Sequence, residues 1–131
     1  MKGIILIGKK TEYNGGPSGI LDGLEEAFKK NNINMISLRL SANDNRLKYI
    51  IELFKAIYLH PDYAVNVHSE GFLLSFLVLL CSKIFRRNRV YFLTVHGIHR
   101  AVNRIYGEYS NFHEVIEVIL LKKFPSLICV S

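Results

Sequence analysis

The sequence contains few cysteines and no long hydrophobic run, and these absences exclude several classes of protein. Its 131 residues include only Cys81 and Cys129, at no spacing typical of a metal site or a redox motif. We therefore expect two buried free thiols, which fits a reducing cytoplasm. The longest apolar run, Phe72 to Cys81, is too short to span a bilayer. Because Met1-Lys2-Gly3 leads directly into a strand-like run, no signal peptide is expected.

Several common motifs are also missing. The glycines match neither the GxGxxG fingerprint nor the P-loop pattern, which disfavours ordinary dinucleotide binding and P-loop chemistry. The histidines show no HExxH-like spacing, so we infer no metal and no bound cofactor. Acidic residues number 11 against 17 basic ones, a net charge of +6 that predicts an anionic partner. No helix-turn-helix, RNP or zinc pattern supports nucleic acid as that partner.

What the chain does contain is an alternation of strand-like and helix-like segments. The predicted strands are Ile4–Ile7, Ile33–Leu40, Tyr63–His68, Val90–Thr94 and Leu127–Val130. The predicted helices are Ile20–Lys30, Leu47–Tyr58 with Asp44 as its cap, the deeply packed Phe72–Phe85, and a helix from Ser110 to Lys123. This order predicts an α/β fold, a Rossmann-like parallel sheet flanked by helices, as one domain over residues 1–131. Ile4–Ile7 should be a central strand, and the last strand should lie near an edge.

A glycine pair, Gly15-Gly16, follows the first predicted strand and precedes a helix. Glycines allow backbone N–H groups to approach a phosphate, and a helix amino end adds partial positive charge. The alternative is a simple Asn-Gly turn at Asn14-Gly15. The pair therefore predicts a phosphate-handling loop or an ordinary turn.

Two histidines, His68 and His96, come at the ends of the third and fourth predicted strands. The carboxyl ends of parallel strands meet at one edge of a sheet, where ligands bind. An imidazole there can hydrogen-bond a sugar hydroxyl or a phosphate, or transfer a proton near neutral pH. A lone histidine would more simply be a loop-packing residue, but two strand-end histidines on one edge favour a site.

Four basic residues, Lys83, Arg86, Arg87 and Arg89, gather at the end of the most apolar predicted helix. They are typical of a surface that attracts an anionic membrane. The same charges also complement a helix carboxyl end and keep it solvated, without any partner. Both interpretations remain open at this point.

In order along the chain, four elements resemble the amino-terminal domain of a family 4, GT-B type glycosyltransferase. They are Gly15-Gly16-Pro17, Asn66-Val67-His68-Ser69, Phe92-Leu93-Thr94-Val95-His96-Gly97 and Leu127-Ile128-Cys129-Val130-Ser131. The resemblance implies one half of a GT-B architecture and retaining transfer of a sugar from a nucleotide-sugar donor. It places Gly15 and Gly16 by the donor diphosphate and His96 by the transferred sugar as the catalytic residue. His68, Ser69, Gly97 and Arg100 would border the acceptor.

The resemblance also implies a second domain, which would carry the donor-binding glutamates and for which this sequence has no counterpart. We therefore expect a fragment or truncated form of such an enzyme, inactive alone, in the cytoplasm or peripheral at the inner face of the membrane. Its partners would be the nucleotide sugar and an acceptor, with an anionic membrane surface or self-association as further possibilities. The alternative is a non-catalytic basic α/β module that docks to a membrane or a partner protein.

Overall fold

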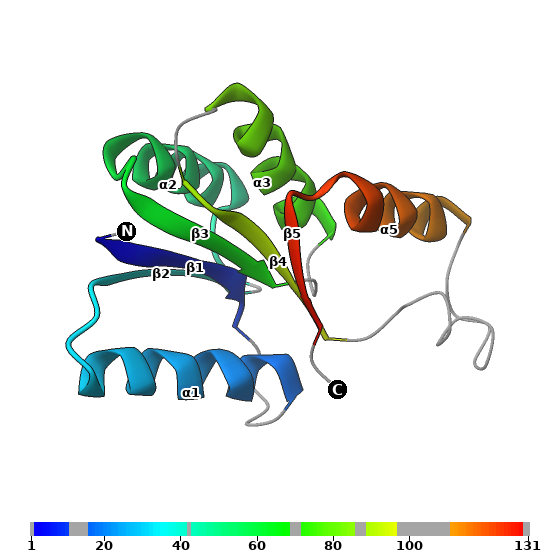
Figure 1. Ribbon diagram of the computed structural model, residues 1–131. Helices are drawn as coiled ribbons and strands as arrows, with labels where there is room; N and C mark the ends of the chain where they lie inside the picture. Colours follow the sequence, from blue (N-terminus) through cyan, green and yellow to red (C-terminus); the bar gives the residue numbers. More distant parts are fainter. Residues whose placement is uncertain are drawn as a thin grey trace.

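The computed structural model describes residues 2–10, 16–41, 43–68, 72–85, 89–96 and 111–129. Strands and helices alternate along these residues (Figure 1). The strands are β1 (Gly3–Lys9), β2 (Met35–Leu40), β3 (Tyr63–His68), β4 (Tyr91–Val95) and β5 (Ser126–Cys129). The helices are α1 (Gly16–Lys30), α2 (Arg46–Leu59), α3 (Phe72–Ile84) and α5 (Asn111–Lys123). The predicted α/β alternation is confirmed, and most element bounds differ from the predicted ones by only one or two residues.

The five strands form one sheet in the order β2-β1-β3-β4-β5. Every neighbouring pair runs parallel, as predicted. The middle strand is β3, and β1 lies beside it with a neighbour on each side. The prediction that the first strand is central therefore holds only in the sense that it is internal. Strand β5 forms an edge and its residues are exposed, which confirms the prediction for the last strand.

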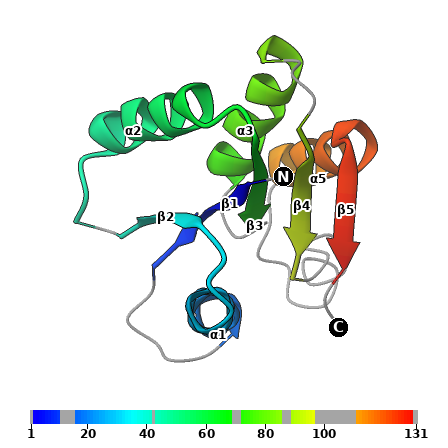
Figure 2. The same cartoon turned by 60° about the vertical axis from the view of Figure 1, so that its left-hand side comes forward.

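The helices cover the two faces of the sheet unequally. Of the helices that the structure describes, only α1 lies on one side, whereas α2, α3 and α5 lie on the other (Figures 1 and 2). Ile5 and Ile7 of β1 join the larger core with the three helices, and Ile4 and Leu6 join a smaller core with Leu21 of α1. The continuous apolar run of β1 exists because alternate side chains enter different cores. This is a Rossmann-like arrangement.

Two helix starts differ from the sequence prediction. Helix α1 begins at Gly16 rather than Ile20. Pro17 permits this because the first helical turn has N–H groups without intrahelical acceptors, so a missing N–H costs nothing there. The cap of α2 is Asn45, not Asp44: Asn45 Oδ1 accepts from the backbone N–H groups of Leu47 at 3.0 Å and Lys48 at 3.3 Å.

Asp44 instead closes the loop before α2. Its carboxylate accepts a 2.9 Å hydrogen bond from the backbone N–H of Ser41. This hydrogen bond is the main cause that lowers the pKa of Asp44 below its ordinary value. Asp44 thus shapes the entry to the helix without capping it.

Two predictions of burial were wrong in part. Cys81 is buried, but Cys129 is exposed because it lies on the edge strand β5. Helix α3 buries one side, including Leu74 and Val78, while Leu73 and Ile84 are exposed. The helix is apolar on both sides, so apolar character alone did not indicate which side faces the core.

Candidate functional site

The site lies at the carboxyl edge of the sheet, between β1 and β3. Strand β2 follows β1 outward in one direction, and β4 and β5 follow β3 in the other. This reversal of strand order is the point where open parallel sheets bind ligands. Helix α1 begins at Gly16 after the end of β1, and β3 ends at His68. One glycine of the predicted pair and one predicted histidine therefore flank the switch point.

Gly8 permits α1 to approach β1 closely at this point. A Cβ atom added to Gly8 would lie 2.5 Å from Leu21 Cδ1 of α1 and 3.7 Å from His68 Cβ. Leu21 is fully buried in the space that a side chain at position 8 would take. The absence of that side chain brings helix, first strand and His68 together.

His68 and His96 meet directly. The sequence predicted that both lie at one edge of the sheet, but not that their rings touch. His68 Nδ1 lies 2.5 Å from His96 Nε2. The ring centroids are 4.7 Å apart and the ring planes differ by 22°. The distance between the ring centroids is about the nitrogen–nitrogen distance plus the radius of each ring. The two nitrogens therefore lie almost on the line that joins the centroids, and the rings meet edge to edge in nearly one plane rather than stacking face to face. They share one hydrogen bond.

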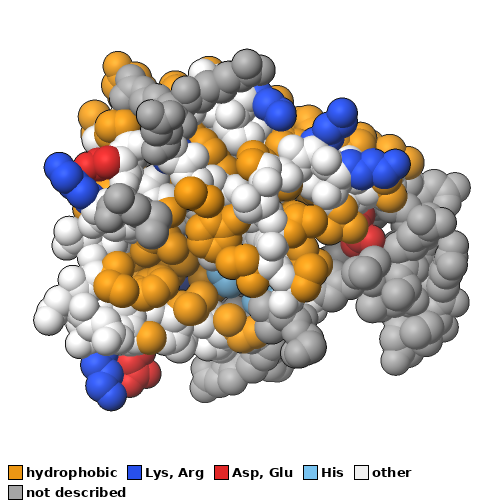
Figure 3. Space-filling model, viewed as in Figure 1, with side chains coloured by type: hydrophobic (Ala, Val, Ile, Leu, Met, Phe, Trp, Pro, Cys, Tyr) orange, Lys and Arg blue, Asp and Glu red, His pale blue; other side chains and the backbone are white. Residues whose placement is uncertain are grey.

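The two rings differ in exposure. His68 is fully buried, whereas His96 is half-buried. His68 Nε2 is buried and has no hydrogen-bond partner among the described residues. The space-filling view shows histidine atoms (pale blue) near the middle of one face, surrounded by hydrophobic side chains (Figure 3). Of the pair, His96 is thus the ring that a ligand can reach from outside.

Burial keeps both rings neutral. It lowers the pKa of His68 to about 4, with smaller effects of the same sign from His96 and Arg39. Burial also lowers the pKa of His96. Two neutral imidazoles suit the contact, since one ring must donate N–H and the other must offer a lone pair. Either direction of donation leaves a neutral pair that can accept a proton only at acidic pH.

A buried polar pair, Asn66 and Thr94, lies beside the histidines on the same face of β3 and β4. Asn66 Nδ2 donates to Thr94 Oγ1 at 2.8 Å and to the backbone carbonyl of Phe92 at 3.3 Å. His68 pairs with Thr94 in the register of the sheet. These residues form a polar row with His68 and His96 between apolar residues of β3 and β4. Neither Asn66 nor Thr94 was among the predicted site residues, although each is a polar residue within an apolar run.

Arg39 of β2 ties α1 to the sheet near this row. Its Nη1 contacts the carboxylate of Asp22 and lies 3.9 Å from Glu25 Oε1. Ser37 donates to the same Glu25 oxygen. The Arg39 side chain is only 11% exposed. Because solvent screens this buried positive charge only weakly, Arg39 contributes to the low pKa of His68.

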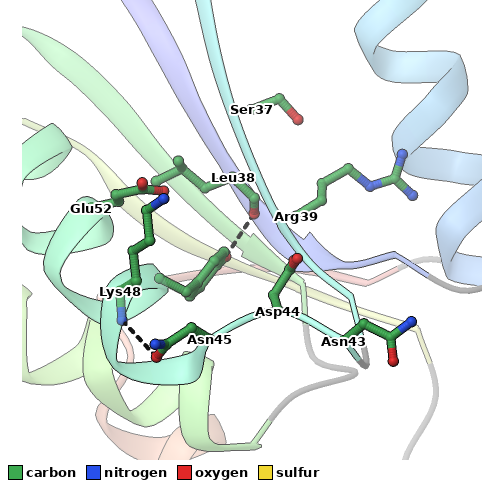
Figure 4. A pocket seen from close by; sticks show the side chains of 9 residues that line it. Ser37, Leu38, Arg39, Asn43, Asp44, Asn45, Lys48 and Glu52 are labelled. Atoms are coloured by element: carbon green, nitrogen blue, oxygen red, sulfur yellow. Dashed lines mark hydrogen bonds between the residues drawn. The ribbon is translucent and has the colours of Figure 1, made fainter.

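Two cavities lined by described residues lie apart from the histidine pair. A groove of about 390 Å³ lies between β2 and the start of α2 (Figure 4). It is lined by Ser37, Leu38, Arg39, Asn43, Asp44, Asn45, Lys48, Tyr49 and Glu52. Tyr49 there donates to the Leu38 carbonyl at 2.7 Å, and burial raises the pKa of its hydroxyl. A smaller cavity of about 120 Å³, with Lys9 and Arg46 among its lining residues, lies between α2 and α3. Neither contains a predicted site residue.

The remaining predicted residues fall in three groups. Gly15, Ser69, Gly97, Arg100, Arg86 and Arg87 lie outside the described residues. Lys83 is exposed on α3. Arg89 turns inward: its Nη2 donates to the carbonyl of Ile57 at 2.7 Å, and its guanidinium carbon lies 5.7 Å from the Tyr91 ring centroid. Arg89 therefore supports the packing of β4 against α2 rather than extending a surface patch from Lys83.

The described residues include no cluster of three or more His, Cys, Asp or Glu side chains able to hold a metal ion. No family model matches the chain, and the searches of curated proteins and of solved structures gave no match. The fold and the site geometry therefore define the class of protein: an α/β protein with a Rossmann-like parallel sheet.

Proposed function

We propose that this chain is the acceptor-side, amino-terminal domain of a retaining GT-B type glycosyltransferase, which moves a sugar from a nucleotide-sugar donor to a glycan, lipid or other acceptor. One observation carries the proposal: His68 and His96 converge at the carboxyl edge of the sheet, beside the switch point between β1 and β3. Open parallel sheets bind ligands at this edge, so two strand-end histidines that meet there favour a site over simple packing. The resemblance of the surrounding motifs points to the same chemistry.

In this proposal His96 contacts the transferred sugar, and His68 positions the His96 ring. A neutral imidazole can hydrogen-bond a sugar hydroxyl without bringing an unpaired charge into a dry cleft. The hydrogen bond between His68 Nδ1 and His96 Nε2 fixes the orientation of the His96 ring, and burial keeps His68 in place. His68 is thus a positioning residue, and His96 the catalytic one.

The other assignments follow the loops at the same edge. Gly15, Gly16 and the amino end of α1 lie at the donor diphosphate in the proposal, because backbone N–H groups and the helix dipole favour a phosphate there. Ser69, Gly97 and Arg100 border the acceptor. The nucleotide sugar is a co-substrate, and the proposal requires no metal.

A single domain supplies only one wall of the cleft. Holding the reactants in the right orientation lowers the activation barrier by about 7–11 kcal/mol in well-positioned reactions. A domain that forms only one wall of the cleft loses most of this effect. We therefore expect the 131-residue chain alone to bind nucleotide sugars no more tightly than about millimolar and to transfer no sugar. Calorimetry with a panel of nucleotide sugars and a radiolabelled transfer assay test both points. Micromolar affinity or authentic turnover would contradict the need for a second domain.

The test of His96 needs the complete cleft. When the chain is joined to a donor-binding domain, His96→Ala should lower turnover by roughly a hundredfold with folding unchanged. His60→Ala is the matched control, because His60 lies between α2 and β3 at the opposite edge of the sheet. Equal turnover in His96→Ala and the parent would show that His96 only packs.

A second candidate function is a non-catalytic basic module that docks to a membrane surface. One observation favours it: large apolar side chains are exposed on α2, α3 and α5 beside lysines. This surface lies on the helical layer and not at the histidine edge, so the two candidates are compatible.

A further inference from the structure

The helices α2, α3 and α5 expose apolar side chains at helical spacing. Leu47, Ile51 and Tyr58 of α2 are four and seven residues apart and are all more than half exposed. Residues at these intervals lie on the same side of a helix. The buried residues of α2, including Leu53 and Ile57, lie on a different side. Helix α2 therefore carries one apolar side for the core and a second for the surface.

The same arrangement recurs on α3 and α5. Leu73, Leu80 and Ile84 are exposed along α3, and Phe112 and Ile119 along α5. The exposed fractions reach 67% at Leu47, 68% at Ile84 and 69% at Phe112. Monomeric proteins rarely expose contiguous apolar surface of this kind without a partner. We call these eight exposed side chains the three-helix surface.

The helices that carry this surface adjoin one another. All three cover the same face of the sheet (Figures 1 and 2). Helices α3 and α5 pack together. Tyr58 of α2 meets Phe85, next to the end of α3, edge-on at 6.2 Å between ring centroids. The apolar side chains therefore belong to one layer of the molecule and not to scattered positions.

Positive charge accompanies the three-helix surface. The three helices carry six basic and three acidic residues, and one of the acidic residues, Glu117, is buried. The single helix of the opposite layer, α1, carries two basic and three acidic residues. Lysines lie within one turn of the apolar residues on each of the three helices: Lys55 on α2, Lys83 on α3 and Lys122 on α5. Blue Lys and Arg side chains lie among orange hydrophobic ones along the upper edge of Figure 3.

We propose that the three-helix surface docks to an anionic lipid bilayer, with its apolar side chains in the interfacial region and the lysines against lipid headgroups. Apolar side chains flanked by lysines are the combination that binds helices to such an interface. Lysine stems extend along apolar surface while the ammonium group reaches the headgroups. A second copy of the chain fits less well, because a symmetric contact would bring the same lysines together.

No described helix is long and apolar enough to cross a membrane, so the proposed contact is peripheral. The proposal rests on the second candidate function, for which it names the surface and the kind of lipid, and it does not depend on the transferase function. It also differs from the basic cluster predicted from the sequence, since Arg89 faces inward and only Lys83 is shared.

The first test measures partition of the unmodified chain to vesicles of phosphatidylcholine with and without phosphatidylglycerol. We expect partition to rise at least roughly tenfold with the anionic lipid. It should fall as salt shortens the Debye length from about 10 Å at 0.1 M to about 3 Å at 1 M. Equal partition to both kinds of vesicle, or no partition to either, overturns the proposal.

The second test uses two sets of variants and a control. Leu47→Gln, Ile84→Gln and Phe112→Gln together should lower partition roughly tenfold, as should Lys83→Glu with Lys122→Glu. The matched control is Lys29→Glu with Lys30→Glu on the opposite layer, which should change partition by less than about twofold.

Two outcomes of these variants contradict membrane docking. An equal loss in the control would show attraction by net charge alone. The second outcome is a parent chain that does not bind vesicles and is a dimer, and that becomes a monomer when the apolar residues are substituted. This result would show that the three-helix surface binds a second copy of the chain. Far-ultraviolet circular dichroism and the urea midpoint verify that each variant is folded.

Discussion

At the scale of single residues, His68 differs from His60 and His96 because its ring is fully buried. The sequence predicted that His68 and His96 would share an edge, since parallel strands end together. It did not predict that they would touch, because contact depends on side-chain orientation and on the space around each ring. The same limit explains why the Asn66–Thr94 hydrogen bond went unnoticed: the two residues are 28 positions apart, and only the register of β3 and β4 joins them.

The first prediction concerns the pH dependence of stability. The pKa of His68 falls from 6.5 to about 4 on folding, mainly through burial. Between these values the unfolded chain binds a proton that the folded chain does not, so stability is full above pH 6.5 and falls as the pH drops toward 4. The shift corresponds to at most about 3 kcal/mol. Urea unfolding of the parent near pH 7 and about pH 5 measures the loss.

Two variants, His68→Gln and His60→Gln, separate the contribution of His68 to this pH dependence from the contributions of other acid-sensitive groups. His68→Gln cannot titrate, so it should lose less stability between the two pH values than the parent, with the remainder due partly to His96. His60→Gln, at a partly exposed loop position, should keep the loss of the parent. A loss in His68→Gln as large as that of the parent would show that His68 is not the group responsible.

At the scale of elements, the glycines show where local sequence preference and packing disagree. Gly23 lies within α1 with nothing within 4 Å of where a Cβ would be, so packing does not require it. At Gly3, at the start of β1, a Cβ would lie 2.7 Å from the Asn34 carbonyl oxygen and 2.7 Å from the Tyr63 ring. Sequence alone treats both as weak points of an element, and only the packed structure distinguishes them.

The second prediction follows from this contrast. Gly23→Ala should raise the free energy of unfolding by about 0.5–1 kcal/mol, because alanine loses less backbone entropy in a helix. Gly3→Ala should lower it by about 1–3 kcal/mol, because a backbone oxygen and a ring must move. Chemical denaturation of the two variants against the parent measures both. Changes of the same sign would contradict the packing described for β1.

Element boundaries were predictable where apolar runs have clear ends, as in β3, whose predicted bounds match the structure. They failed where a polar start looks like a loop. Helix α1 includes Gly16 and Pro17, residues that local propensity assigns to a turn. Similarly, the apolar pattern of α3 correctly predicted a helix. It did not predict which side of the helix faces the core, because both sides carry large hydrophobic residues.

At the scale of the whole molecule, the parallel sheet was predictable from the alternation of elements, but the strand order was not fully so. Placing β3 in the middle depends on the direction of each crossover over the sheet, and no local pattern encodes that direction. The unequal layers are likewise a property of the assembled fold. Among the described helices, α1 covers β1 and β2 on one side, and α2, α3 and α5, with exposed apolar and basic side chains, cover the other side of the sheet.

The central claim is that the histidine pair at the carboxyl edge forms a sugar-nucleotide site. Nuclear magnetic resonance of the imidazole groups during titration with nucleotide sugars tests it most directly on this chain. The account predicts that the His96 and His68 signals shift together, with half-saturation at about millimolar ligand, while His60 at the opposite edge does not respond. His96→Ala should abolish the response of His68 to the ligand. If nucleotide sugars at several times that concentration leave both signals unchanged, or shift His60 equally, the edge is not the site.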